Sequence, residues 1–388
     1  MSRNPGQRPI IFVVAAEPSG DALGGPIINS IEAKAPGRFR FVGVGGEQMI
    51  EAGLETLFPM SDITAFGLTE VLPRIPHILK RLKQVAQAAE AMNPVLVLTI
   101  DGPDFSFRLV KKLTALSCPK VHVVAPTVWA WRPKRAKKVA GLYDHLLCLF
   151  PFEPDYFTPL GVEASFIGHP EAFNPVYDDA VRPVLTEAPH VTLLPGSRRS
   201  EIEHMLKPML ITLYNLRWTH PQVTATIPAL PAMQGAIELV MQRMPGSESA
   251  VSVDCRENAL FDALARSRGV LAASGTVTLQ TALYGVPGVA CYITSGLSAA
   301  IGRRLVRMDR VILPNALLGR EVYPFLFQEA ATPRELTRAL LQVLDDGTAE
   351  ARAAFRYMFD ACRGQSTRRH HPRPAPRRPR RPRRPPPL

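Results

Sequence analysis

Short apolar runs alternate with helix-like stretches along most of this chain. In the first half the apolar runs lie at residues 10–16, 40–44, 95–100, 120–124 and 145–150. They read as continuous runs rather than as alternating apolar and polar positions, which is typical of parallel strands buried on both faces. The stretch 69–92 between two of these runs has a helical pattern that Pro73 and Pro76 interrupt. The pattern predicts a doubly wound α/β domain.

A second series of the same kind follows a break in the pattern at residues 171–189. This segment is rich in Pro and Asp and has no apolar periodicity, so we interpret it as an interdomain linker. The later apolar runs lie at residues 191–194, 224–228, 250–253, 269–272 and 288–292. The fold class that we predict is α/β, with two Rossmann-like doubly wound domains that face a cleft. Their expected bounds are residues 1–170 and 190–345, followed by a C-terminal helix at 346–362.

Composition adds a C-terminal tail to this picture. The chain has 388 residues, which is too long for one ordinary core, and a net charge of +12. Residues 363–388 hold ten Arg and no acidic residue, whereas the rest carries 36 basic and 34 acidic groups. We therefore expect a disordered Arg/Pro-rich tail on a nearly neutral body. A nucleic-acid-binding protein that acts through this tail is the weaker alternative, and no specific nucleic-acid partner is expected.

Other composition features exclude several classes of protein. The five Cys are scattered and form no C-x-x-C pair, which argues against a disulfide framework or a zinc site. No apolar stretch is long enough to predict a transmembrane helix. Residues 10–16 resemble the core of a signal peptide, but they end in Glu17-Pro18 and are better interpreted as a buried first strand.

Two polar junctions in the second half predict a site for a diphosphate. The sequence L-L-P-G-S-R-R-S-E covers residues 193–201, and A-A-S-G-T-V-T-L-Q covers residues 272–280. Each follows an apolar run and opens a predicted helix, whose N-terminus offers unpaired N–H groups and partial positive charge. Arg198 in the first junction adds a planar fork of donors that can grip phosphate oxygens.

Acidic residues follow two predicted strands in the first half. Glu17 and Asp21 would repel a phosphate and suit sugar hydroxyls instead, although Asp21 could equally cap the following helix. Asp101 leaves its strand at a Gly-Pro turn and is the preferred general base. Asp104 is better interpreted as a cap of the helix that begins near Phe105.

Two further motifs are open to two interpretations. The Trp residues of V-W-A-W-R at residues 128–132, beside a basic cluster, could grip a sugar and an anion, or could pack under the next helix. In the motif at residues 313–321, Asn315 can donate and accept hydrogen bonds and Arg320 can bind phosphate. A plain loop and helix start would explain much of that motif.

Taken in order, these motifs resemble those of the lipid-A-disaccharide synthases, glycosyltransferase family 19 of the two-domain GT-B architecture. The resemblance spans roughly residues 10–345. It is carried by E-x-S-G-D at 17–21, G-V-G-G at 43–46, G-L-T-E-V-L at 67–72, I-D-G-P-D-F at 100–105, V-W-A-W-R at 128–132, P-F-E-P at 151–154, G-H-P at 168–170, L-L-P-G-S-R at 193–198, S-G-T at 274–276 and L-P-N-A-L-L-G-R-E at 313–321.

The resemblance implies an inverting sugar transfer. The donor would be UDP-2,3-diacylglucosamine, the acceptor 2,3-diacylglucosamine 1-phosphate (lipid X), and the products the β-1,6-linked lipid A disaccharide 1-phosphate and UDP. It implies catalytic roles for Asp101, Arg198 and Asn315. The residues that it implies for binding substrate or UDP are Glu17, Ser19, Asp21, Gly196, Ser197, Ser274, Gly275, Thr276, Gln280, Arg320 and Glu321. No D-x-D motif stands out, so no metal or other cofactor is expected.

One residue departs from the family pattern. The family usually has Glu at the end of its S-G-T motif, where many GT-B enzymes hold the ribose hydroxyls, and this chain has Gln280. An amide oxygen accepts hydrogen bonds more weakly than a carboxylate, so nucleotide affinity should suffer. Another GT-B enzyme of UDP-sugars, such as a UDP-N-acetylglucosamine epimerase, is the alternative within the same architecture.

The acyl chains of such substrates imply contact with an anionic membrane surface. Apolar residues lie beside basic ones at residues 63–68 and 75–83, and again at 297–308. Basic amphipathic surfaces suit anionic bilayers, although ordinary helices with one buried face explain each segment as well. The expected location is cytoplasmic, peripheral on the cytoplasmic face of the inner membrane. The resemblance leaves a homodimer open.

Overall fold

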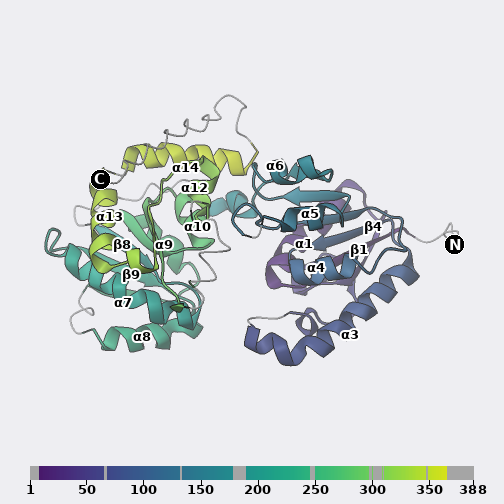
Figure 1. The fold of residues 1–388 in the computed structure, drawn as a ribbon, viewed down its shortest axis with the longest axis horizontal. Helices are drawn as coiled ribbons and strands as arrows, with labels where there is room; N and C mark the ends of the chain where they lie inside the picture. Colours follow the sequence, from purple (N-terminus) through teal and green to yellow (C-terminus); the bar gives the residue numbers. More distant parts are fainter. Residues whose placement is uncertain are drawn as a thin grey trace, which may run out of the picture. The chain divides into compact units, whose positions relative to one another are not determined.

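The computed structural model describes residues 8–64, 68–131, 133–177, 189–244, 250–296, 299, 308, 310–346 and 348–364. The chain divides into two compact units (Figure 1). Unit 1 comprises Met1–Ala180, Ser295–Val311 and Cys362–Gly364, and unit 2 comprises Val181–Thr294, Ile312–Ala361 and Gln365–Leu388. Each unit is built around one parallel sheet, so the predicted α/β class with two Rossmann-like domains is confirmed.

Unit 1 has a seven-stranded parallel sheet in the order β3-β2-β1-β4-β5-β6-β7. The strands are β1 (Ile10–Ala15), β2 (Arg40–Val44), β3 (Leu54–Thr56), β4 (Leu96–Ile100), β5 (Lys120–Val123), β6 (His145–Cys148) and β7 (Glu163–Phe166). Five of them match the predicted strands to within two residues. The edge strands β3 and β7 were not predicted, because they are only three and four residues long and lie within polar sequence.

Helices cover both faces of this sheet. They are α1 (Pro18–Lys34), α2 (Glu47–Glu51), η1 (Met60–Asp62), α3 (Leu68–Met92), α4 (Pro103–Val110), α5 (Arg135–Ala140), α6 (Pro154–Phe157), η2 (Thr158–Leu160), η3 (Pro170–Phe173) and η4 (Pro175–Tyr177). Along β1, Phe12 packs in a core cluster with residues of α3 and α4, whereas Val13 packs in a different cluster with residues of α1 and α2. Burial on both faces explains why β1 is apolar at every position.

Helix α3 continues through Pro73 and Pro76, where the sequence pattern predicted an interruption. A proline removes one helical hydrogen bond and can kink a helix without ending it.

Unit 2 has a six-stranded parallel sheet in the order β10-β9-β8-β11-β12-β13. The strands are β8 (His190–Leu194), β9 (Thr224–Pro228), β10 (Val251–Asp254), β11 (Gly269–Ala273), β12 (Gly288–Tyr292) and β13 (Phe325–Phe327). The helices are α7 (Arg199–Leu216), η5 (Pro231–Met233), α8 (Gln234–Gln242), α9 (Ala259–Arg266), α10 (Val277–Leu283), α12 (Leu313–Leu318), η6 (Gln328–Ala330), α13 (Pro333–Asp346) and α14 (Thr348–Cys362). All five predicted strands are present, and only the short edge strand β13 was missed.

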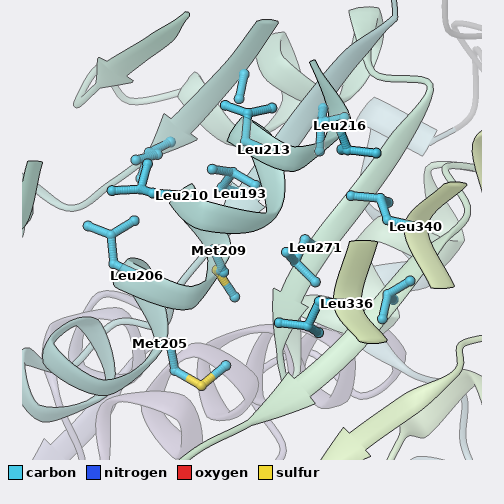
Figure 2. Packing of buried hydrophobic residues seen from close by; sticks show 14 of the residues in the cluster. Leu193, Met205, Leu206, Met209, Leu210, Leu213, Leu216, Leu271, Leu336 and Leu340 are labelled. Carbon is cyan, nitrogen blue, oxygen red and sulfur yellow. The ribbon is translucent and has the colours of Figure 1, made fainter. Parts of the chain in front are cut away.

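The core of unit 2 rests on two neighbouring helices, α7 and α13. Met205, Met209 and Leu213 of α7 lie over the sheet beside Leu336 and Leu340 of α13 (Figure 2). All of these side chains are at most 3% exposed. This packing anchors α7 on the sheet. It therefore also positions the polar residues that precede the helix.

The strand order reverses once in each sheet. In unit 1 the reversal lies between β1 and β4, and in unit 2 between β8 and β11. At such a point the connections leave toward opposite faces of the sheet, which opens a crevice at the carboxyl ends of the two strands. In this chain the predicted acidic residues follow β1 and β4, and the predicted diphosphate junctions follow β8 and β11.

The boundaries between the domains differ from those predicted. Residues 171–177 of the predicted linker form η3 and part of unit 1, and residues 178–188 lie outside the described part. Ser295–Val311 groups with unit 1 rather than with the second domain.

The disordered tail was predicted to begin at residue 363, but the described structure continues to residue 364. The backbone N–H of His169 donates to the Cys362 carbonyl at 3.0 Å, and the Arg363 side chain donates to the Ala172 carbonyl. The Arg363 guanidinium also lies 5.7 Å from the centre of the Phe173 ring. These contacts place Arg363 in unit 1. The Arg/Pro-rich stretch at 365–388 is outside the described residues.

Candidate active site

The reversal point of unit 1 brings acidic and hydroxyl side chains together. Strands β1 and β4 pair in parallel, with Ala15 opposite Ile100. The residues that follow these strands therefore meet at one edge of the sheet. The Ser19 hydroxyl donates a hydrogen bond of 2.6 Å to Asp101 Oδ2. This edge thus joins the E-x-S-G-D and I-D-G-P-D-F motifs, which are about eighty residues apart in the sequence.

Asp101 is held in an unusual backbone conformation. Its φ angle is +51°, in the left-handed region that residues other than Gly rarely adopt. Two hydrogen bonds support it, from the Asp101 N–H to the Val123 carbonyl at 3.0 Å and from Ser106 Oγ to the Asp101 carbonyl at 2.8 Å. Such a conformation costs about 1–3 kcal/mol and is found mainly at functional sites. The surrounding contacts therefore fix the direction of this carboxylate.

Gly20 allows helix α1 to approach the end of β4. A Cβ atom at this position would lie 2.8 Å from the Ile100 carbonyl oxygen and 3.5 Å from the Asp101 Cβ. The first distance is too short for any side chain. The glycine of the E-x-S-G-D motif is thus a condition for the bond between Ser19 and Asp101.

Glu17 lies in the same cluster and is half-buried. Burial raises the pKa of the Glu17 carboxyl above its ordinary value, and the negative charges of Asp101 and Asp104 raise it further. Two interacting carboxylates whose environments differ can divide the roles of acid and base. Glu17 therefore accepts a proton more readily than an ordinary glutamate does.

Asp21 serves the fold in the described structure. Its carboxylate accepts hydrogen bonds from the backbone N–H groups of Gly46 at 2.8 Å, Met49 at 3.0 Å and Gln48 at 3.2 Å. These groups begin helix α2, so Asp21 caps α2 rather than α1, in which it lies. The side chain is 6% exposed. This role accounts for the motifs at residues 17–21 and 43–46 together, and leaves little of Asp21 to face a sugar.

Asp104 does not cap helix α4, contrary to the prediction. The residue at the cap position is Gly102, and no side chain caps this helix. Asp104 is the second residue of the helix, in its first turn, and its carboxylate pairs with Arg135 at 3.1 Å.

The motif around Trp129 packs inside unit 1. The Trp129 indole N–H donates to Glu153 Oε1 at 3.1 Å, and the same carboxylate accepts from the backbone N–H groups of Leu149 and Phe150, each at 3.0 Å. The Phe150 ring in turn stacks on His169, with ring centres 5.0 Å apart. The motifs at 128–132, 151–154 and 168–170 therefore form one buried aromatic cluster. For Trp129 the packing interpretation is correct.

In unit 2, the first diphosphate junction already holds a carboxylate. Glu201 Oε2 accepts from the backbone N–H groups of Ser197 at 3.1 Å and Arg198 at 3.3 Å, and Glu201 Oε1 accepts from Arg198 Nη1 at 3.0 Å. Two N–H groups of this junction, those of Ser197 and Arg198, are therefore occupied by Glu201. The Glu201 side chain had not been singled out, although a Glu three residues after a helix cap is the sign of a capping box. The Arg198 side chain is 77% exposed and can exchange partners.

The second junction lies beside the first. Strands β8 and β11 pair in parallel, with Leu194 opposite Ala272, so Gly196 and Ser274 follow neighbouring strand ends. Among the described residues, no hydrogen bond uses the N–H groups of Gly275 and Thr276. Both residues are exposed, and Gln280 is half-buried on α10.

Asn315 positions the loop that carries Arg320 and Glu321. Its Oδ1 accepts from the backbone N–H groups of Val322 and Tyr323, each at 2.9 Å, and its Nδ2 donates to the Tyr323 carbonyl at 2.8 Å. The Tyr323 hydroxyl is bonded to Thr281 on α10 at 3.0 Å. This chain of bonds connects the motif at 313–321 to the helix of the S-G-T motif. A direct contact between Asn315 and a substrate stays a prediction.

Two expected absences can be compared only with the described residues. Within them, no helix is long and apolar enough to cross a membrane. No three His, Cys, Asp or Glu side chains of the described part gather as metal ligands would. The second predicted membrane segment, 297–308, lies almost entirely outside these residues.

Comparisons with known proteins agree with this architecture. The family model of lipid-A-disaccharide synthetase matches residues 11–372. The lipid-A-disaccharide synthase of Rhodospirillum centenum is 41% identical over 348 residues, which cover 88% of this chain and 86% of the relative. Among solved structures, S. aureus MnaA with UDP aligns with a TM-score of 0.55 and 12% identity, over 92% of this chain and 91% of its own. Acinetobacter baumannii MurG aligns with a TM-score of 0.53 and 12% identity, over 94% and 96%.

The solved structures, at such low identity, show the fold alone. Two parallel Rossmann-like sheets with this likeness define a GT-B-like protein. The family match and the curated relative decide the rest. The chain belongs to the lipid-A-disaccharide synthase family, and it is a glycosyltransferase with that activity in lipid A biosynthesis.

The buried Glu153 predicts a pH-dependent stability. Burial raises the pKa of Glu153 to about 7 from an ordinary value of 4.5, so the folded protein binds this proton more tightly than the unfolded chain does. The resulting stabilisation is complete below about pH 4.5 and is lost as the pH rises through about 7, with a total on the order of 3 kcal/mol. The Glu153→Gln variant should lose this part of the pH dependence in urea unfolding at about pH 5 and pH 8. The exposed Glu51→Gln control should keep this pH dependence. An equal change in the free energy of unfolding between pH 5 and pH 8 for wild type and Glu153→Gln would contradict the assignment.

Proposed function

We propose that the chain transfers 2,3-diacylglucosamine from UDP-2,3-diacylglucosamine to the 6-hydroxyl of 2,3-diacylglucosamine 1-phosphate, with Asp101 as the general base. The observation that carries this proposal is the position of Asp101 at the reversal point of the first sheet. Its backbone is in the left-handed conformation, and its carboxylate accepts a hydrogen bond from Ser19. That is the place where α/β sheets bind ligands. The residues match those that the family resemblance implies for this role.

The reaction requires a balanced displacement. Asp101 removes the proton of the acceptor's 6-hydroxyl as that oxygen forms a bond with the anomeric carbon of the donor sugar. The bond from that carbon to the diphosphate oxygen breaks at the same time, and its electron pair leaves with UDP. Attack from the face opposite the leaving group inverts the anomeric carbon.

Neighbouring residues support this step in unit 1. The Ser19 hydroxyl orients the Asp101 carboxylate through its 2.6 Å hydrogen bond. Burial raises the pKa of the Glu17 carboxyl, so this group accepts a proton more readily than an ordinary glutamate.

Residues of unit 2 supply positive charge for the departing UDP. The Arg198 guanidinium is exposed and can turn from Glu201 to a diphosphate. The N–H groups of Gly275 and Thr276 and the exposed Arg320 side chain complete the set that we assign to UDP. Ser197, Ser274 and Glu321 line the same loops. We propose no metal requirement.

Removal of the base should abolish turnover while the fold persists. In an assay with both substrates, Asp101→Asn should lower kcat by about 100-fold or more, because a general base contributes that much. The matched control is Asp155→Asn, an exposed carboxylate in the first turn of α6. Its kcat should stay at the wild-type value. Normal turnover by Asp101→Asn would remove Asp101 as the base.

The same assay separates this function from an epimerase. Disaccharide should form only when donor and acceptor are both present. An epimerised sugar released from the UDP-sugar alone would favour the alternative.

Restoration of the usual family residue should tighten UDP binding. A carboxylate accepts hydrogen bonds from ribose hydroxyls more strongly than an amide, so Gln280→Glu should lower the Kd for UDP about three- to tenfold. Isothermal titration calorimetry measures this change. Gln242→Glu, an exposed residue at the end of α8, adds the same charge elsewhere in unit 2 and should leave the Kd unchanged. Weaker binding by Gln280→Glu would show that the carboxylate does not meet the ribose.

We further propose that helix α3 contacts an anionic membrane from the cytoplasmic side. Ile75 and Leu79 are 38% and 45% exposed, and the exposed Lys80 and Lys83 lie beside them. Arg74 and Arg81 of the same segment are bound within unit 1, to the Thr64 carbonyl and to Asp62. The proposed membrane contact therefore has fewer basic side chains than the sequence pattern predicts.

Sedimentation with vesicles tests this surface. Wild-type protein should sediment with vesicles that contain phosphatidylglycerol, and less so at high salt because screening weakens the lysine contribution. The Ile75→Asn, Leu79→Asn double variant should reduce the bound fraction several-fold. Ile50→Asn, equally exposed on α2, is the control. Unchanged sedimentation by the double variant would exclude α3 as the contact.

A further inference from the structure

A groove in unit 1 has the composition of an anion site. It lies between α4 and α5 and has a cavity volume of about 770 Å³. We define the basic groove by its five cationic side chains, which are Arg108, Lys111, Lys134, Arg135 and Lys138. The sequence alone indicates the residues near Lys134 only as a basic cluster beside the Trp motif.

The charge of the basic groove is not balanced by the protein. Among the described residues that line it, Asp104 is the one acidic side chain, and its carboxylate pairs with Arg135. Within the described residues, no hydrogen bond or ion pair engages the side chains of Arg108, Lys111, Lys134 or Lys138. Several like charges around one hollow repel one another, and a bound anion with more than one negative charge relieves that repulsion.

The inner wall of the groove is apolar. Phe107, Val139 and Leu142 line it, and the Arg135 guanidinium lies 6.0 Å from the centre of the Phe107 ring. A hollow with cations above apolar side chains suits an anionic group that carries hydrocarbon, and it is less suited to free inorganic phosphate. Its concave form also favours one head group over a flat bilayer surface.

The basic groove adjoins the cluster around Asp101. Helix α4, which forms one wall, begins at Pro103, two residues after Asp101. Asp104 borders the groove, and its charge also acts on Glu17. One end of a sugar ring can thus lie near the carboxylates while the other end reaches the cations.

We propose that the basic groove binds the phosphate monoester of the acylated acceptor sugar and so selects the phosphorylated acceptor. This inference rests on the transferase function proposed above. A phosphate monoester carries a charge of about −1.5 to −2 at pH 7, which matches a group of unpaired cations. The donor carries its phosphates in UDP, so this groove distinguishes the acceptor from the donor.

A kinetic comparison of two acceptors tests the proposal. The acceptors are 2,3-diacylglucosamine 1-phosphate and its counterpart without the phosphate, each in mixed micelles of neutral detergent. The Lys111→Gln, Lys138→Gln double variant should raise KM for the phosphorylated acceptor about tenfold, because it removes two charge-assisted contacts. Its kcat and its KM for the donor should stay at wild-type values, and its preference for the phosphorylated acceptor should shrink by the same factor.

A matched control uses the adjacent lysines. The Lys112→Gln, Lys137→Gln double variant removes the same charge from exposed residues that do not line the groove. It should keep the wild-type KM for both acceptors. A tenfold rise of this control's KM for the phosphorylated acceptor would show that net charge alone causes the effect, and would overturn the proposal.

The outcomes separate this inference from the function itself. Wild-type turnover establishes the transferase, and an unchanged KM in the Lys111→Gln, Lys138→Gln variant would then overturn the groove alone. The same holds if that variant loses sedimentation with anionic vesicles while its acceptor KM is unchanged, because the groove would then hold bilayer head groups. If wild type makes no disaccharide, the function fails, and titration with soluble glucosamine 1-phosphate still tests the groove. Binding that the groove variant loses and the control keeps would support a phosphate site.

Discussion

The hydrogen bond between Ser19 and Asp101 is the constraint on which the unit 1 site depends. It exists because β1 and β4 are neighbours at the point where the strand order reverses. Only Gly20 allows the start of α1 to approach β4 so closely, and the left-handed Asp101 turns its carboxylate toward Ser19. Glu17 enters the same cluster because it directly precedes α1. Three small features of the backbone therefore give two carboxylates different environments, which is what acid–base chemistry needs.

Several residues of the family pattern hold the shape of the protein. Asp21 caps α2, Glu153 holds Trp129 and the strand end at Phe150, and Asn315 binds the backbone of its own loop. Each of these side chains is polar and lies at the end of a strand or helix, where buried N–H groups lack partners. A polar residue that satisfies such groups looks in sequence like one that binds a substrate. The hydrogen bonds of the structure identify the side chains that satisfy backbone groups.

Glu201 holds the backbone of the loop that we propose for UDP. Its carboxylate accepts from the Ser197 and Arg198 N–H groups and from the Arg198 guanidinium, so it satisfies donors that would suit a diphosphate. In the proposed complex the diphosphate takes Arg198 from Glu201, and this exchange costs little because the ion pair is exposed on the Arg198 side. The basic groove of unit 1 differs, because four of its cations have no carboxylate partner among the described residues.

The apolar pattern of the sequence is enough to predict the α/β class and ten of the thirteen strands of the described part, because buried parallel strands are apolar throughout. It also predicts the strand ends at which the candidate residues lie. It missed β3, β7 and β13, whose three or four residues are too short to show a period. Only the tertiary structure decided that Ser19 bonds Asp101, that Asp104 pairs with Arg135, and that the cations of α4 and α5 face one groove. These pairings depend on strand order and on the direction of each side chain, and neither follows from spacing along the chain.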